Sequence, residues 1–176
     1  LPWYFPQELT LLQAMAGAFD GPDTASGLLQ AARHGRPWLW SALLGLALGV
    51  VGWRAPASRR QGALLLGGAL LGLFGVLGAA FAIGARGWTF AGAHSMFGEL
   101  TVGQPGIGVG GALVLLALLI QLAAGVARLG AFRGDLFIAG AVVLSAALLA
   151  LFVALPVARA LAGAFLDDAG QPSVSI

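Results

Sequence analysis

Four long apolar stretches, separated by polar segments, dominate the chain. They cover residues 37–53, 62–85, 106–127 and 136–158, and none of them contains a charged side chain. A helix rises about 1.5 Å per residue, so an apolar stretch of about 20 residues can cross the hydrocarbon core of a bilayer. The pattern therefore predicts four transmembrane helices, of which the first is short.

The residues before the first stretch are more polar and too irregular to span a membrane. The opening run LPWYFP is typical of an apolar segment that ends in an aromatic interface belt, so we expect a preceding span to end here. Residues 7–19 and 24–34 show helical spacing of apolar side chains on either side of the turn at 20–22. We expect two short helices there, resting on the membrane surface.

Composition places the chain in the membrane class. It is 59% hydrophobic and 9% charged with a mean hydropathy of +0.92, whereas a soluble domain carries about 25% charged residues. We therefore predict an all-α, polytopic transmembrane helical bundle in a lipid bilayer, with four complete spans plus interfacial helices. Its parts are an outward-facing region at 1–36, a four-helix transmembrane region at 37–163 and an outward-facing segment at 164–176.

The placement of the basic residues does not favour nucleic-acid binding, and the lack of cysteine excludes thiol chemistry. All nine basic residues are arginine, and they are scattered along the chain rather than clustered. We therefore predict neither a nucleic-acid partner nor a polybasic lipid-binding patch. The chain has no cysteine, which excludes disulfides and thiolate metal sites.

Small residues recur at helical spacing in the first two spans. They are Ser41, Gly45, Gly49 and Gly52 in the first, and Gly68, Gly72, Gly75 and Ala79 in the second. Such faces let two membrane helices approach closely, so we expect these spans to pair. Gln121 and Ser145 are the notable polar side chains inside the later spans, and we expect each to bond to a neighbouring helix or to its own backbone.

Arginine placement predicts the orientation. The tight connections at 54–61 and 128–135 together hold five of the nine arginines. Two spans separate these connections, so they share one side of the membrane, and the positive-inside rule places that side in the cytoplasm. The loop at 86–105 and both terminal segments then face outward, where six of the seven acidic residues also lie.

Two sequence patterns suggest chemistry and have simpler interpretations. Gly106, Gly108 and Gly111 match G-x-G-x-x-G, but that pattern indicates a dinucleotide site only between a strand and a helix. A closely packed helix start is the favoured interpretation. In Arg133-Gly134-Asp135, which resembles an adhesion tripeptide, a cytoplasmic position favours a local charge pair.

A base, a hydroxyl and a carboxylate lie close together in the loop at His94, Ser95 and Glu99. Side chains of these types occur in hydrolase and metal sites. Neighbouring positions in a loop, however, do not establish the geometry that a nucleophile and its base require. We therefore predict no enzymatic activity and assign no catalytic, cofactor-binding or metal-ligating residue. A membrane hydrolase centred on His94 is the remaining alternative of this class.

The end of the chain resembles a known family. In the permeases of binding-protein-dependent ABC importers, a helix ending in Phe-x-x-x-Pro leads to a Ser- or Ala-Phe pair and a short link with Asp and Gly. The matching residues are Phe152, Pro156, Ala164-Phe165, Asp167-Asp168 and Gly170. Residues 81–90, 94–114 and 131–140 are also similar to the extended amino-terminal region of the bacterial iron(III) type.

The resemblance implies a multi-pass permease subunit in the bacterial inner (plasma) membrane. Its expected partners are an ATP-binding subunit and a periplasmic solute-binding protein, and its expected substrate is ferric iron. Related permeases carry thiamine, phosphonates or polyamines. The coupling loop E-A-A-x-x-x-G of this family is not found in the sequence, so we expect the permease core to follow Ile176. The rival hypothesis is a self-contained four-span structural or accessory membrane protein.

Overall fold

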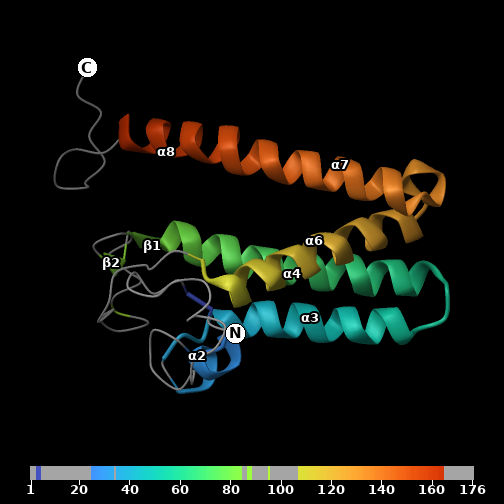
Figure 1. The fold of residues 1–176 in the computed structure, drawn as a ribbon, viewed down its shortest axis with the longest axis horizontal. Helices are drawn as coiled ribbons and strands as arrows, with labels where there is room; N and C mark the ends of the chain where they lie inside the picture. Colours follow the sequence, from blue (N-terminus) through green and yellow to red (C-terminus); the bar gives the residue numbers. More distant parts are fainter. Residues whose placement is uncertain are drawn as a thin grey trace.

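Long helices make up most of the structure, a computed structural model that describes residues 3–4, 25–33, 35–84, 87–88, 95 and 107–164. The main helices lie lengthwise beside one another (Figure 1). In chain order the elements are α2 (Gly27–Arg33), α3 (Leu39–Arg54), α4 (Arg59–Ala82), β1 (Ile83–Gly84), β2 (Gly87–Trp88), α6 (Val109–Arg128), the 3-10 turn η1 (Ala131–Gly134), α7 (Leu136–Leu149), the π-helical turn η2 (Ala150–Ala154) and α8 (Leu155–Ala164). The expected all-α class is confirmed, with β1 and β2 forming only a two-residue antiparallel ladder.

Among the described residues, three helices are long and apolar enough to cross a membrane. They are Arg59–Ala80, Val109–Arg128 and Leu136–Ala158, which agree with the second, third and fourth predicted spans. Helix α3 has 16 residues, a length of about 24 Å against a hydrocarbon core of about 30 Å. Its ends carry the exposed rings of Trp40 and Trp53, side chains that favour the bilayer interface.

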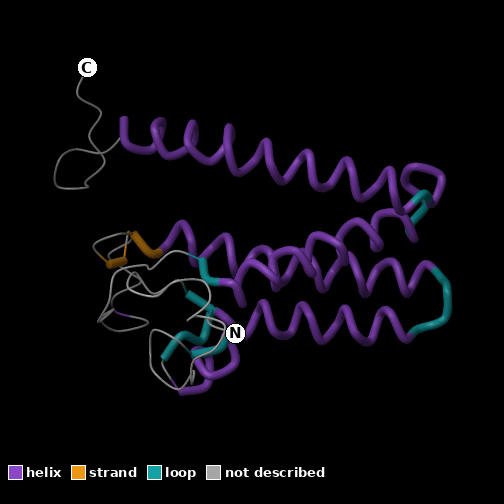
Figure 2. The backbone as a smooth tube through the Cα atoms, viewed as in Figure 1, coloured by secondary structure: helices purple, strands orange, loops and turns teal. Residues whose placement is uncertain are grey.

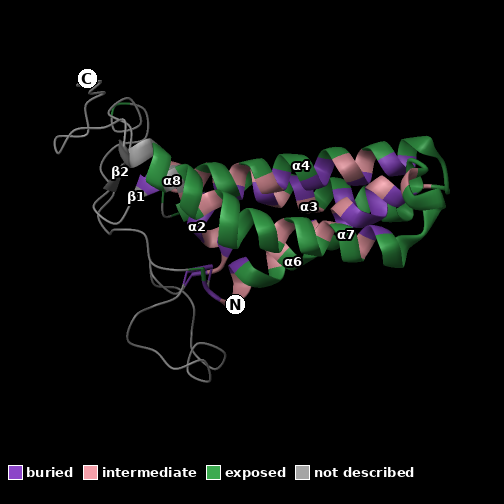
Figure 3. Cartoon of the chain, turned by 90° about the horizontal axis from the view of Figure 1, so that it is seen from above, coloured by how far each residue is buried: buried purple, intermediate pink, exposed green. Residues whose placement is uncertain are grey.

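Glycine faces hold α3 against α4, as the sequence predicts. Gly45 and Gly49 of α3 are buried, and so are Gly68 and Gly72 of α4. An added Cβ on Gly45 would lie 2.5 Å from the carbonyl oxygen of Gly68 and 2.9 Å from Cα of Gly72. The two backbones therefore touch directly, a contact that depends on residues without side chains. Figure 3 shows buried positions alternating with exposed ones along these helices.

Helix α6 packs on α4 through another run of small residues. Ala123, Ala124 and Gly125 are buried, and an added Cβ on Gly125 would lie 2.6 Å from the backbone nitrogen of Leu66. The larger Leu118 fills the space over Gly72, where its Cδ2 atom would lie 2.6 Å from an added Cβ. Helices α3, α4 and α6 thus form one closely packed unit.

Helix α7 packs much less tightly. Ala139 is its only buried residue, in a small cluster with Ala123 and Ala127 of α6. That contact lies near the turn that joins the two helices, whereas α8, at the far end of the same rod, lies apart from the bundle in Figure 1. Most of the surface of α7 is therefore free of contact with α3, α4 and α6.

Both tight connections lie at the same end of the bundle, as predicted (Figure 1). The five arginines of this end are exposed; they are Arg54, Arg59, Arg60, Arg128 and Arg133. At the first connection the Ser58 hydroxyl caps α4 by accepting from the backbone N–H of Gln61 at 3.3 Å. We refer to this end as the arginine end.

The second connection has an unusual backbone. Gly130, Phe132, Arg133 and Gly134 all have positive φ, a region that residues other than glycine seldom adopt. The left-handed turn delivers Asp135 to the start of α7, where Oδ1 accepts from the backbone N–H groups of Phe137 at 2.8 Å and Ile138 at 3.0 Å. Asp135 is thus an N-cap, and this corrects the expected charge pair with Arg133.

Pro156 lies in a helix that continues past it. Helix α7 runs through η2 into α8 as one rod (Figure 2). Within this passage the N–H of Leu155 donates to the carbonyl of Ala150, a bond across five residues. Proline has no N–H and its ring crowds the preceding turn of an α-helix, and a wider π-helical turn accommodates both effects.

Candidate functional site

The buried side chain of Gln121 joins three helices through hydrogen bonds. It extends from α6 and is 3% exposed. Its Nε2 donates to the carbonyl of Gly45 on α3 and to that of Leu65 on α4, both at 3.1 Å. The expected interhelical hydrogen bond is confirmed, and Gln121 makes two of them, one to α3 and one to α4.

Two glycines make room for this amide. An added Cβ on Gly68 would lie 2.5 Å from Nε2 of Gln121, and one on Gly49 would overlap its side-chain oxygen. Gln121 can reach the carbonyl of Gly45 because Gly49 and Gly68, which lie against its amide, have no side chains. Polar groups inside a membrane gain from such bonds because lipid supplies no alternative partner. We call Gln121, Gly45, Gly49, Leu65 and Gly68 the glutamine junction.

The chemistry of the junction is that of a neutral amide. It can hold backbone carbonyls together, but it carries no charge and no proton that titrates near neutral pH. Among the residues the structure describes, no group of three His, Asp or Glu side chains is placed to hold a metal ion. Ser145, the other polar candidate, lies exposed on α7, away from the junction. The junction therefore fixes helix positions.

A second cluster of contacts, around Trp3 and Tyr4, lies at the end of the bundle opposite the arginine end (Figure 1). The N–H of Trp3 donates to the carbonyl of Ala25 at 3.1 Å, and the carbonyl of Trp3 accepts from the N–H of Gly108 at 2.8 Å. Trp3 and Tyr4 are both 5% exposed, and the guanidinium of Arg36 lies 4.1 Å from the centre of the Tyr4 ring. This cation–π contact fixes the segment beside the first turn of α3.

The glycine pattern of this region serves packing. Gly111 is buried, and an added Cβ would lie 2.8 Å from the carbonyl oxygen of Trp3. Gly108 donates to that same oxygen, whereas Gly106 lies outside the described residues. The favoured interpretation, a closely packed helix start, is confirmed at these two positions.

The His94 loop remains a prediction. His94 and Glu99 lie outside the described residues, and Ser95 is exposed. The segment at 165–176, which carries Phe165, Asp167, Asp168 and Gly170 of the family resemblance, also lies outside them. Phe152 and Pro156 are described, and both are exposed on the α7–α8 rod.

Sequence reasoning missed the docking of Trp3 and Tyr4. The aromatic run at the start of the chain indicated an interface belt, but no local pattern showed that its backbone would bond to residues 25 and 108. The signal that was present is Gly108 and Gly111, because glycines at a helix start allow another backbone to approach.

Comparison with known proteins gives no relative for this arrangement. No protein-family model, no curated protein and no solved structure matches the chain. The chain is an all-α protein with helices long and apolar enough for a membrane. A functional proposal therefore rests on the geometry of these helices, on the glutamine junction and on the residues of the resemblance.

Proposed function

We propose that the chain is the amino-terminal membrane part of a permease subunit of an ABC importer, of the iron(III) type, in the bacterial inner membrane. The support is the resemblance at residues 152–176, together with that at 81–90, 94–114 and 131–140. Three helices of spanning length are consistent with a multi-pass subunit.

The observation that carries the proposal is the uncovered state of the α7–α8 rod. Phe152 is 71% exposed and Leu149 is 63% exposed, although the rod is the longest apolar helix in the described chain. A span that packs so little against its own bundle offers most of its surface to other helices. In the proposed permease, the rod is the first helix of the transporter core and packs against the helices that follow it.

The other helices then have a supporting role. Helices α3, α4 and α6 contain no charged side chain between Leu39 and Val51, Gly62 and Ala82, or Val109 and Ala127, and ionisable groups inside the membrane are the usual markers of a transport path. Transport in membrane proteins proceeds by movement of helix groups around a site near the midplane. The bundle acts as a fixed scaffold beside that movement, which the core and the ATP-binding subunit carry out.

Uptake and partner capture test this proposal together. The full natural chain, tagged and expressed in its own host, should co-purify with an ATP-binding subunit. Its deletion should abolish the uptake of radioactive ferric iron supplied with the cell's own periplasmic binding proteins. Uptake of radioactive thiamine, phosphonate and polyamine is measured in parallel as a control for substrate.

The outcomes separate the rival functions. If the deletion abolishes uptake of thiamine, phosphonate or polyamine instead of iron, and an ATP-binding subunit is captured, the protein is still an importer subunit but its substrate is the other solute. A protein that captures no ATP-binding subunit and whose deletion leaves all four uptake rates unchanged would contradict the proposal. That result would favour the self-contained structural or accessory protein.

A further inference from the structure

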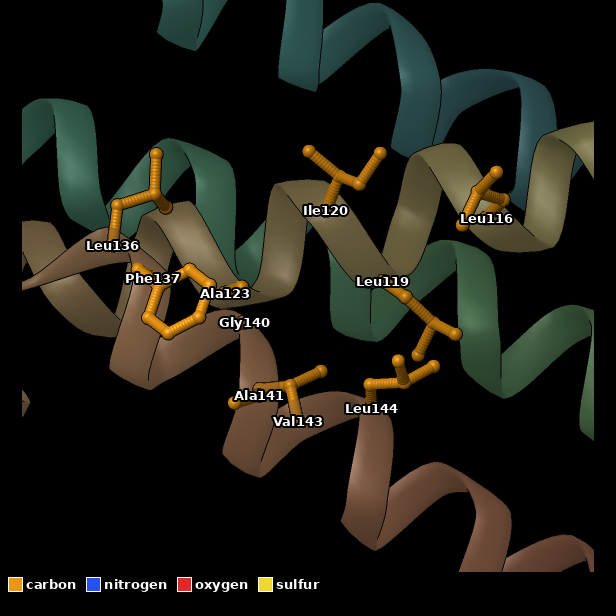
Figure 4. Close-up of a pocket in the computed structure, with 10 residues that line it drawn as sticks. All are labelled: Leu116, Leu119, Ile120, Ala123, Leu136, Phe137, Gly140, Ala141, Val143 and Leu144. Atoms are coloured by element: carbon orange, nitrogen blue, oxygen red, sulfur yellow. The ribbon is translucent and has the colours of Figure 1, made fainter.

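A groove runs between α6 and α7 beside the arginine end (Figure 4). Its volume is about 470 Å³. Its lining contains no polar side chain; it consists of Leu116, Leu119, Ile120, Ala123, Leu136, Phe137, Gly140, Ala141, Val143 and Leu144. These residues belong to two helices of membrane-spanning length, so in a membrane the groove would lie at the level of the hydrocarbon core.

The groove reaches through most of one leaflet. It begins at Leu136, the first residue of α7, and extends to Leu144. Eight helical steps correspond to about 12 Å, and one leaflet supplies about half of a hydrocarbon core of about 30 Å. The groove therefore covers most of the apolar depth of the leaflet at the arginine end.

The polymethylene chain of a lipid is narrow enough to enter this apolar groove without displacing α6 or α7. The groove is open beside Gly140, since an added Cβ at this position would have nothing within 4 Å.

Two exposed arginines adjoin the lining residues in the sequence at the arginine end, and they favour an anionic headgroup. Arg128 ends α6 and Arg133 lies in the turn before α7, and both are exposed. Asp135 is the acidic residue of this turn, and its Oδ1 accepts the two backbone N–H groups that it caps. Basic pockets between membrane helices at the cytoplasmic surface bind anionic lipid headgroups.

We propose that the α6–α7 groove binds one acyl chain of an anionic phospholipid, whose phosphate lies at Arg128 and Arg133. Aliphatic and aromatic side chains hold the acyl chain in the leaflet at the arginine end. The two guanidinium groups supply the selectivity, because arginine binds phosphate oxygens with paired donors. This inference requires that the chain be embedded in a membrane and is independent of the importer proposal.

Native mass spectrometry of the full natural chain tests the lipid site. Phosphatidylglycerol and phosphatidylcholine with identical acyl chains are titrated onto delipidated protein, and the dissociation constant of the first bound lipid is measured for each. We expect phosphatidylglycerol to bind about thirtyfold more tightly, since two arginines near the surface each contribute on the order of 1 kcal/mol.

Two variants separate the groove from the charge. Gly140→Phe fills the groove and should remove the tight phosphatidylglycerol site, whereas Gly67→Phe on α4, where an added Cβ also meets nothing within 4 Å, should retain it. The double variant Arg128→Gln/Arg133→Gln should bind both lipids equally. Its matched control, Arg54→Gln/Arg59→Gln, should keep the preference. Far-UV circular dichroism of each variant checks that the helices are intact.

Three results would overturn the proposal. The first is equal affinity of the unaltered protein for both lipids. The second is a preference for phosphatidylglycerol that survives Gly140→Phe, or one that is lost equally in Gly67→Phe. The third is a dimer of the unaltered chain that Gly140→Phe dissociates, because the groove would then accommodate a second copy of the protein.

Discussion

Replacing Gly45 with alanine is expected to separate α3 from α4 and to lower the free energy of unfolding by about 3 kcal/mol, at the upper end of the usual cost of overpacking. The new methyl group would lie 2.5 Å from the carbonyl oxygen of Gly68 and 2.9 Å from Cα of Gly72. Both are backbone atoms, so no side chain can rotate away, and the helices must move apart.

Reversible unfolding in mixed micelles, followed by far-UV circular dichroism, measures this loss. The matched control is Gly67→Ala on α4, where an added Cβ has nothing within 4 Å. Alanine stabilises an exposed helical position relative to glycine by up to about 1 kcal/mol, so the control should be as stable as the unaltered protein or more so. Equal stabilities for Gly45→Ala and Gly67→Ala would contradict the direct backbone contact.

Gly49→Ala is expected to cost about 2 kcal/mol by a different route. Its methyl group would overlap the side-chain amide of Gln121, which must then release the carbonyls of Gly45 and Leu65. Two interhelical bonds are lost, each worth on the order of 1 kcal/mol in a membrane. Gln121→Ala should destabilise the bundle by a similar amount, because it removes the same two bonds.

The double variant Gly49→Ala/Gln121→Ala provides the test. If the amide causes the damage, Gly49→Ala should cost little once Gln121 is gone, and the cycle should show a coupling of about 1 to 2 kcal/mol. Costs that simply add would show that Gly49 is sensitive for another reason. Gly78→Ala, where an added Cβ meets nothing within 4 Å, is the control substitution in both backgrounds.

The sequence was most informative where physical constraints act along a single helix. Membrane crossing requires an uninterrupted apolar run, so the positions of α4, α6 and the α7–α8 rod in the sequence follow from the charge-free stretches at 62–85, 106–127 and 136–158. Helix pairing in lipid requires small residues on one face, and Gly45 meets Gly68 and Gly72 as their spacing predicts. The sequence predicted that Gln121 would bond to a neighbouring helix or to its own backbone. It could not name Gly45 and Leu65 as the partners, because these depend on the register between helices.

Contacts between distant segments were not predictable from local patterns. Trp3 bonds to Ala25 and Gly108, yet nothing in the sequence around Trp3 specifies either partner. The role of Asp135 was misassigned for a related reason. A neighbouring Arg133 suggested a charge pair, whereas the left-handed backbone of the turn directs the carboxylate to the N–H groups that begin α7.

The α6–α7 groove was likewise absent from the sequence analysis. Its lining residues are ordinary apolar residues of two spans, and the groove exists because α7 contacts α6 mainly around Ala139. Gly140, beside that contact, leaves its side of α7 open. Such a feature depends on how far two helices diverge, which hydrophobic periodicity does not encode.

Accessibility of single cysteines tests the central claim, a membrane bundle whose two arginine-bearing turns face the cytoplasm. The chain has no cysteine of its own, so Ala57→Cys, Leu129→Cys and Leu28→Cys can be labelled one at a time. With a membrane-impermeant maleimide added to intact cells, we expect Leu28→Cys to react and the other two to react only after the inner membrane is opened. Labelling of Ala57→Cys or Leu129→Cys in intact cells would contradict the account.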